Sequence, residues 1–254
     1  MKKIVSTLVF GALLASTANA DFLRVEAGLG AWSQDSSGEL SYSKNSLVGG
    51  SDISKENSFT NAYAWMIVKH PIPLVPNLRL EYAQVKNDGL ASGTFNDFSA
   101  TPNTTTTMKI KEYDIIPYYN ILDNTFWATL DLGVDIKILD IDYRANGVTI
   151  NGITNQNYND SKTVAIPLGY ARTRVEIPAT NIGLEADVKY ITYDGSTVYD
   201  NRIKADYTFD MFPVVQPAVE VGYRMQKIDV KTDSDKTKID LKFSGFYAGL
   251  MVRF

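Results

Sequence analysis

The segment FWATLDLGVDIK (126–137) places an apolar residue at every second position. Its even-numbered positions, from Phe126 to Ile136, are all apolar, and its odd-numbered positions include two aspartates and a lysine. Successive side chains of a β-strand point to opposite faces. The segment therefore predicts a strand with one apolar face and one polar face.

The same period-two pattern recurs along the chain, in segments that begin at Leu23, Leu78, Ile182, Ile203 and Val219. Each segment is about ten residues long, whereas strands of globular proteins usually have about five or six. A tilted strand that crosses a bilayer needs ~9–11 residues. Alternation alone fits a soluble sheet as well as a membrane barrel, but strands of this length favour the barrel.

The connections between these strands alternate between short and long, as an up-and-down barrel requires. Four short turns, rich in the residues that turns prefer, are 70–77, 120–125, 176–181 and 211–217. The outer connections are 34–59, 86–107, 138–162, 194–201 and 231–237. With both chain ends on the periplasmic side, this pattern predicts an all-β fold, a transmembrane up-and-down antiparallel β-barrel of ten strands.

Three features of the sequence fit this scheme less well. Pro117 and Pro167 fall inside expected strands, where a missing N–H weakens the ladder. Arg172 and Arg174 have the same parity as the apolar residues earlier in their strand. The last strand needs a bulge near Ser244–Gly245, because its first apolar residues are out of phase with its last ones.

The first twenty residues have the features of a signal peptide. Two lysines near the start are followed by an apolar stretch (4–14) and by the small-x-small cleavage site Ala18-Asn19-Ala20. We therefore predict export, with residues 1–20 removed and residues 21–254 forming one barrel domain.

The end of the chain carries a pattern of its own. Apolar residues at every second position lead to a terminal aromatic residue, and one face of the last strand holds Phe246, Leu250, Val252 and Phe254. This pattern resembles the C-terminal signature of Gram-negative outer-membrane β-barrels, which their assembly machinery reads.

Three longer segments resemble a small, largely uncharacterised outer-membrane β-barrel family: HPIPLVPNLRLEY (70–82), YDIIPYYNILDNTFWATLDLG (113–133) and NIGLEADVKY (181–190). The resemblance implies a location in the cell outer membrane, with its lipid and lipopolysaccharide as surroundings. It also implies the barrel-assembly machinery as a partner during biogenesis. The long loops match least, and the resemblance supplies no catalytic motif.

The composition excludes several other functions. None of the 254 residues is cysteine, so the chain has no disulfide, thiolate metal site or cysteine nucleophile. The formal net charge of -4 gives no basic footprint for nucleic acid. We expect neither a cofactor nor a metal site.

The polar faces of the strands would line the barrel interior. They carry seven basic residues, Arg24, Arg79, Lys137, Lys189, Lys204, Arg224 and Arg253. They also carry eleven acidic residues, Glu26, Glu81, Glu112, Asp114, Asp131, Asp135, Glu185, Asp187, Asp206, Asp210 and Glu220. Opposite charges that pair across the interior would close it, as side chains do in small barrels. An open interior would instead be a narrow channel with a mild cation preference.

An enzymatic function of the known barrel hydrolases would need a histidine, and this sequence has one. Barrel hydrolases pair aspartates or a serine with a histidine, and the only histidine, His70, lies in the first periplasmic turn. We therefore expect no catalytic activity and a structural or surface-interaction role. A narrow channel for small solutes or ions is the alternative, and a barrel hydrolase comes third.

Overall fold

The computed structural model describes residues 23–254, apart from 45–46, 53–57, 73, 96, 126, 213 and 233–236. The predicted signal peptide, 1–20, lies outside the described residues. The strands are β1 Arg24–Lys44, β2 Leu47–Asp52, β3 Phe59–Lys69, β4 Asn77–Thr94, β5 Ser99–Thr125, β6 Ala128–Ile150, β7 Ile153–Ile177, β8 Ile182–Tyr193, β9 Ser196–Thr208, β10 Gln216–Thr232 and β11 Thr237–Arg253. No helix in this part of the chain is long and apolar enough to cross a membrane.

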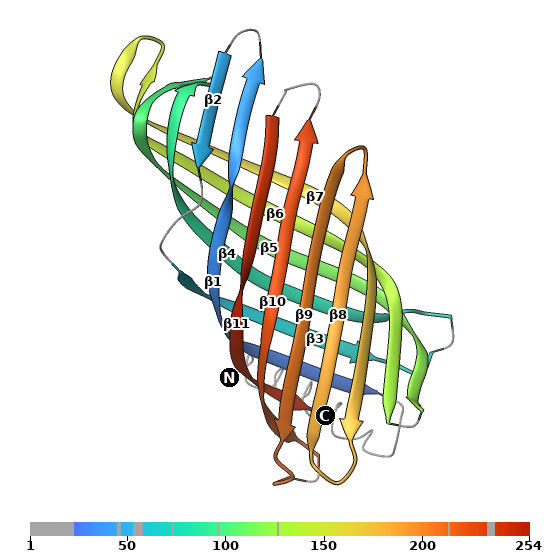
Figure 1. The fold of residues 1–254 in the computed structure, drawn as a ribbon. Helices are drawn as coiled ribbons and strands as arrows, with labels where there is room; N and C mark the ends of the chain where they lie inside the picture. Colours follow the sequence, from blue (N-terminus) through green and yellow to red (C-terminus); the bar gives the residue numbers. More distant parts are fainter. Residues whose placement is uncertain are drawn as a thin grey trace, which may run out of the picture.

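The strands form one antiparallel sheet that closes into a ring (Figure 1). Strands β4 to β11 follow one another around the sheet, and β11 pairs with β1 to close it. Strands β2 and β3 share one place in the ring, because β1 pairs with β3 along residues 24–34 and with β2 along residues 39–44. The ring therefore has ten strand positions, and the predicted ten-stranded up-and-down barrel is confirmed.

One half of the barrel shows the alternation predicted from the sequence. On β6 the outward residues Leu132, Val134 and Ile136 are 44%, 50% and 42% exposed. The inward residues Asp131 and Asp135 are buried. This half has an apolar exterior and a polar interior, as a barrel in a lipid bilayer requires.

The apolar exterior is nearly as high as the apolar band of known outer-membrane barrels. On β6 it runs from Leu130 to Ile138, which is about 27 Å along a strand that rises ~3.4 Å per residue. A tilt of about 40° reduces this to roughly 20 Å along the membrane normal, close to the ~25 Å apolar band of outer-membrane barrels. Exposed aromatic residues lie near both edges of this band, at Tyr113, Tyr190 and Phe246 and at Tyr119, Phe209 and Phe254.

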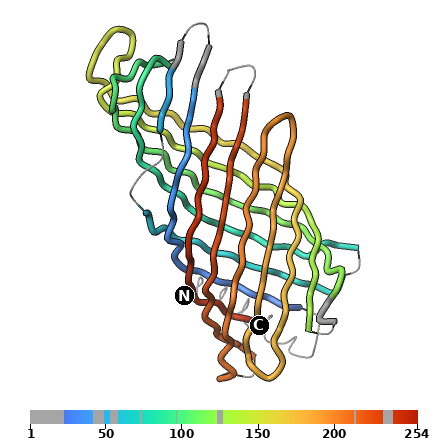
Figure 2. Tube along the Cα trace, viewed as in Figure 1, coloured from blue at the N-terminus to red at the C-terminus, as the bar shows by residue number. Residues whose placement is uncertain are grey.

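Beyond this band the pattern reverses. On β6 the next outward residues are Asp140 and Asp142, while the next inward residues, Leu139 and Ile141, join the hydrophobic core. The barrel thus continues as a second half with a polar exterior and an apolar interior, formed by residues 35–52, 86–111, 139–168 and 227–243 except those not described. We call this half the extension. In Figure 2 its longest strands, β5 to β7, continue past the turn between β8 and β9.

The extension corrects the predicted loops. The sequence predicts connections at 34–59, 86–107 and 138–162, but strands β1, β2 and β4 to β7 occupy most of these residues. The prediction was wrong because these segments are rich in Ser, Thr and Asn, which are frequent in loops. Here such residues form the water-facing side of paired strands.

The bulge predicted at Ser244–Gly245 is also absent from β11. The register between β10 and β11 is unbroken along both strands. The prediction assumed that Leu241 and Phe243 face lipid, but they lie inside the extension and are only 2% and 1% exposed. The inward and outward residues of β11 therefore alternate without interruption. What changes along the strand is whether the residues on a given face are polar or apolar.

The other two difficulties have related explanations. Arg172 and Arg174 do lie on the same inward face of β7 as the apolar Leu168, because this face passes from the extension into the membrane half. Pro167 lies where β7 pairs only with β6, since pairing with β8 begins at Gly169. At Pro117 the ladder between β5 and β6 has a gap, with no shift of register.

Candidate functional site

The interior of the membrane half is filled with charged side chains, which we call the lumen network. Among the described residues its acidic members are Glu26, Glu81, Glu112, Asp114, Asp131, Asp135, Glu185, Asp187, Asp200, Asp206 and Glu220. Its basic members are Arg79, Lys137, Arg172, Arg174, Lys189, Arg202, Lys204, Arg224 and Arg253. None of these residues is more than 8% exposed, so they pack against one another across the barrel.

Two lysines lie at the centre of the network. Nζ of Lys189 is 2.6 Å from Glu81 and also contacts Asp114. Nζ of Lys137 is 2.9 Å from Asp114 and 3.0 Å from Asp200. Asp114 thus joins both ammonium groups, and side chains from five strands, β4, β5, β6, β8 and β9, meet at this point.

Arginines form the layer nearer the short turns, at the end of the barrel where β1 begins and β11 ends. The Arg172 guanidinium reaches Asp131 and Glu185, each at 2.7 Å. Its neighbour Arg174 donates to both oxygens of Asp206, at 2.6 and 3.0 Å. Such two-pronged pairs fix the angle of the side chain as well as its position.

Aromatic side chains complete the packing around the charges. The Tyr63 hydroxyl and the Trp65 ring N–H donate to the same oxygen of Glu220, at 2.7 and 2.9 Å. The Lys204 ammonium lies 4.4 Å from the centre of the Trp65 ring. The Arg224 guanidinium, in turn, lies 4.6 Å from the centre of the Trp32 ring.

Ion pairs are needed here because burial of single charges costs several kcal/mol each. The network avoids isolated charges by giving most groups two or more partners of opposite sign. Arg202, for example, contacts Glu81 at 2.5 Å and Asp187 at 3.0 Å. Removal of one member would therefore leave several partners uncompensated.

The network contains most of the interior residues expected from the sequence and adds others. Arg24, although it pairs with Glu26, has a side chain that is 47% exposed. Asp210 follows the end of β9 and is exposed. Neither residue belongs to the buried network.

The structure brings in four residues that the sequence reasoning missed, namely Arg172, Arg174, Asp200 and Arg202. Asp200 and Arg202 lie on β9, where a loop was predicted as far as residue 201. The parity of Lys204 and Asp206, followed backwards along the strand, would have found both.

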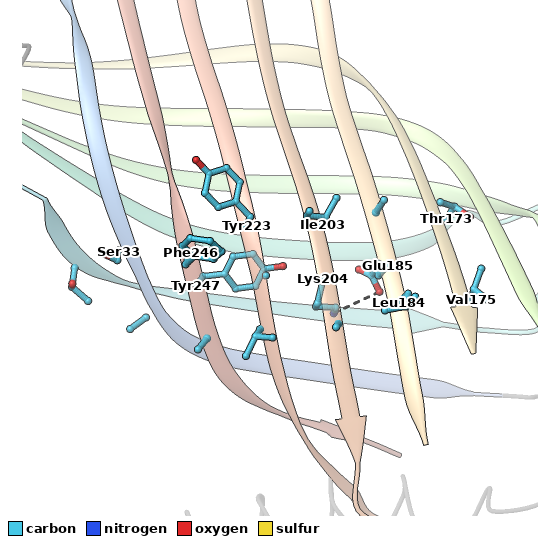
Figure 3. Close-up of a pocket in the computed structure, with 17 residues that line it drawn as sticks. Ser33, Thr173, Val175, Leu184, Glu185, Ile203, Lys204, Tyr223, Phe246 and Tyr247 are labelled. Atoms are coloured by element: carbon cyan, nitrogen blue, oxygen red, sulfur yellow. Dashed lines mark ion pairs between the residues drawn. The ribbon is translucent and has the colours of Figure 1, made fainter. Parts of the chain in front are cut away.

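A groove of about 910 Å³ lies on the lipid-facing side of the network. Small side chains from four strands line it, namely Ala31, Ala186, Ala205 and Ala248, between larger ones such as Ile203, Tyr223 and Phe246 (Figure 3). The ion pair between Lys204 and Glu185, drawn as a dashed line in Figure 3, lies at the same level. The groove opens onto the apolar band.

His70 lies in the connection between β3 and β4, as the sequence predicts. Its Nε2 donates to the Pro76 carbonyl at 3.1 Å, and its Nδ1 accepts the backbone N–H of Ile72 at 3.2 Å. The imidazole therefore binds the backbone of its own turn.

Comparison with known proteins supports the fold. The structure is similar to the outer membrane protease OmpT from Escherichia coli, with a TM-score of 0.56 and 10% identity over 94% of this chain and 99% of that one. The fold is that of an outer-membrane β-barrel. No family model and no curated protein sequence matches the chain.

Two weaker similarities are to parts of autotransporters. The translocator domain of NalP from Neisseria meningitidis gives a TM-score of 0.38 at 12% identity, covering 100% of this chain and 98% of that one. The transport unit of AIDA-I from Escherichia coli gives 0.35 at 10% identity, covering 93% and 91%. TM-scores this low do not show a common arrangement of strands.

The similarity to a protease corrects one expectation. The sequence led us to expect no catalytic activity, on the grounds that the only histidine lies in a turn. Since an enzyme has this fold over nearly its whole length, a ten-stranded barrel of this kind does not exclude catalysis.

Proposed function

We propose that this outer-membrane barrel has a closed lumen and a structural or surface-interaction role, with the extension as its interacting part. The observation that carries the proposal is the division of the interior into two layers, one charged and one apolar. The lumen network occupies the membrane half, and an apolar core that includes Leu139, Leu168 and Leu241 lies directly beyond it. The narrow channel, the alternative from sequence, would need water to pass both layers.

Recording of ionic current across a planar bilayer tests the closed lumen. We expect the refolded protein to give no discrete conductance steps, because buried ion pairs such as Lys137 with Asp200 cross the lumen. A porin inserted in the same bilayer shows that the assay detects an open barrel. Reproducible steps from protein that migrates as folded on an unboiled gel would establish the channel instead.

We also propose that the end of β11 is read during assembly, and that lipid and lipopolysaccharide surround the barrel. Phe246, Leu250 and Phe254 are 74%, 65% and 44% exposed on the lipid-facing side. Val252 lies on the same face, so the four residues form a stripe that a partner can contact before the barrel enters the membrane.

Substitution of the terminal residue tests this role. Phe254→Ala is expected to lower the amount of folded barrel in cells by about tenfold, while refolding into pure lipid vesicles stays unchanged. Phe209→Ala is the control, because Phe209 is an exposed aromatic at the same edge of the band but not in the stripe. Equal effects of both substitutions, or an equal loss in vesicles, would show that Phe254 acts only as a lipid anchor.

A further inference from the structure

The apolar interior of the extension is not completely filled. It contains a cavity of about 300 Å³. Two walls of aliphatic side chains face each other across it: one includes Ile110, Leu139 and Ile166, from β5 to β7, and the other includes Ile228 and Leu241, from β10 and β11. An unfilled apolar space forfeits the dispersion contacts that its lining could make, so an apolar molecule that entered it would gain them.

The cavity has an opening where the barrel wall is incomplete. Strand β7 pairs with β8 only along residues 169–177, because the hairpin of β8 and β9 turns back at Asp194–Gly195. In the described part of the chain, residues 153–168 of β7 are paired on their β6 side alone. This unpaired part of β7 contains Tyr158, Asp160 and Lys162, which line the cavity at its opening, the mouth.

The mouth combines aromatic rings with charged groups. The ring of Phe98 lies 4.5 Å from that of Phe95 and 4.6 Å from that of Tyr158, measured between centres. The Tyr158 hydroxyl donates to Asp97 at 3.3 Å. Burial, with the nearby carboxylates of Asp160 and Asp97, raises the pKa of Tyr158 to about 12, so this hydroxyl remains a donor at neutral pH.

The inner end of the cavity is closed. Below Ile110 and Ile228, the next inward residues of the same strands are Glu112 and Gln226, and the Gln226 amide donates to Glu112 at 2.6 Å. Arg224 binds the same glutamate at 3.0 Å. The lumen network is therefore the floor of the cavity, and a ligand can enter and leave only through the water-facing extension.

We propose that this cavity binds the hydrocarbon chain of a small amphiphile whose cationic head group lies at the mouth beside Asp97 and Asp160. One water molecule takes about 30 Å³ in the liquid, so the cavity holds a chain of roughly ten non-hydrogen atoms. Aromatic faces and carboxylates both attract an organic cation. Among the described residues that line the cavity, the carboxylates Asp97 and Asp160 outnumber the basic Lys162.

This inference deepens the proposed surface-interaction role and rests on it, since the cavity must face the outside of the cell. Its test uses the full barrel in lipid nanodiscs with labelled isoleucine methyl groups, titrated with decyltrimethylammonium and, separately, with decanoate. The methyl signals of Ile141 and Ile166, both lining the cavity, report binding. Those of Ile115 and Ile136, both lipid-facing, report amphiphile that only dissolves in the bilayer.

As decyltrimethylammonium is added, we expect the shifts of the two cavity signals to reach a plateau. The shifts of the two lipid-facing signals should keep growing without a plateau. Val164→Trp, which fills the cavity, is expected to weaken binding by about tenfold or more. Thr163→Trp is the matched control, because the adjacent Thr163 points away from the cavity into water and its substitution leaves binding unchanged. The double variant Asp97→Asn, Asp160→Asn should weaken binding of the ammonium by about tenfold and that of decanoate not at all.

The proposal is overturned if the cavity signals do not saturate, or if Val164→Trp binds as tightly as the original chain. Binding of decanoate as tight as that of decyltrimethylammonium overturns the assignment of a cationic head group. The closed lumen is tested separately. Conductance steps together with unchanged ligand binding would contradict only the closed lumen, and would still support the cavity.

Discussion

Substitution of Lys189 by methionine is expected to lower the free energy of unfolding by about 3–5 kcal/mol, the loss usual when one partner of a buried ion pair is removed. Lys189 is fully buried. Its ammonium contacts Glu81 and Asp114, and lies 3.8 Å from Asp200 and 4.0 Å from Asp135. Methionine has a similar length, so the change removes the charge and leaves these four carboxylates facing one another.

The free energy is measured by unfolding in urea from lipid vesicles. Lys86→Met is the control, since Lys86 pairs with Asp88 at 3.4 Å on the water-facing side of the extension, where such pairs contribute at most about 1 kcal/mol. Lys189→Arg keeps the charge and should cost less than Lys189→Met. A cost for Lys189→Met no larger than that for Lys86→Met would show that water reaches this part of the lumen.

Gly30→Val is expected to lower the fraction of molecules that close into a barrel. Gly30 faces Gly249 where β1 and β11 close the ring. A Cβ atom on Gly30 would lie 2.2 Å from the Ala248 carbonyl oxygen and 2.6 Å from the Gly249 Cα. Since these obstacles are backbone atoms, they can move only if the two strands separate, and we expect a loss of about 3 kcal/mol, at the upper end for overpacking.

The folded fraction is measured by comparing unboiled and boiled samples on a denaturing gel. Gly50→Val is the control, because a Cβ there meets only the Leu40 carbonyl oxygen, at 3.9 Å. Gly50 lies on β2, which pairs with the outer part of β1 but not with β11. If both variants give the same amount of the folded form, the contact between β1 and β11 is looser than the structure indicates.

The sequence was sufficient to predict the half of the barrel that lies in lipid. There, each face of a strand has one chemistry, so the parity of Glu185, Asp187 and Lys189 was enough to place all three inside. The ten strand positions followed from the same alternation together with the four short turns.

The extension could not be predicted in the same way, because its faces have the opposite chemistry. A pattern that assigns apolar residues to lipid misplaces Leu241 and Phe243, and it makes Arg172 look out of phase. Both errors disappear when the change from polar to apolar along one inward face is recognised. The cavity could not have been found from the sequence, since its walls come from strands far apart in the chain.

The reversal of the pattern also gives a way to locate the membrane boundary from inside the protein. The inward residues change from polar or charged to apolar between Lys137 and Leu139 on β6 and between Gln226 and Ile228 on β10. On the outer face of β6, the apolar residues end at Ile138, at the same level. The interior alone therefore marks the depth at which this barrel leaves the bilayer, without reference to any lipid-facing residue.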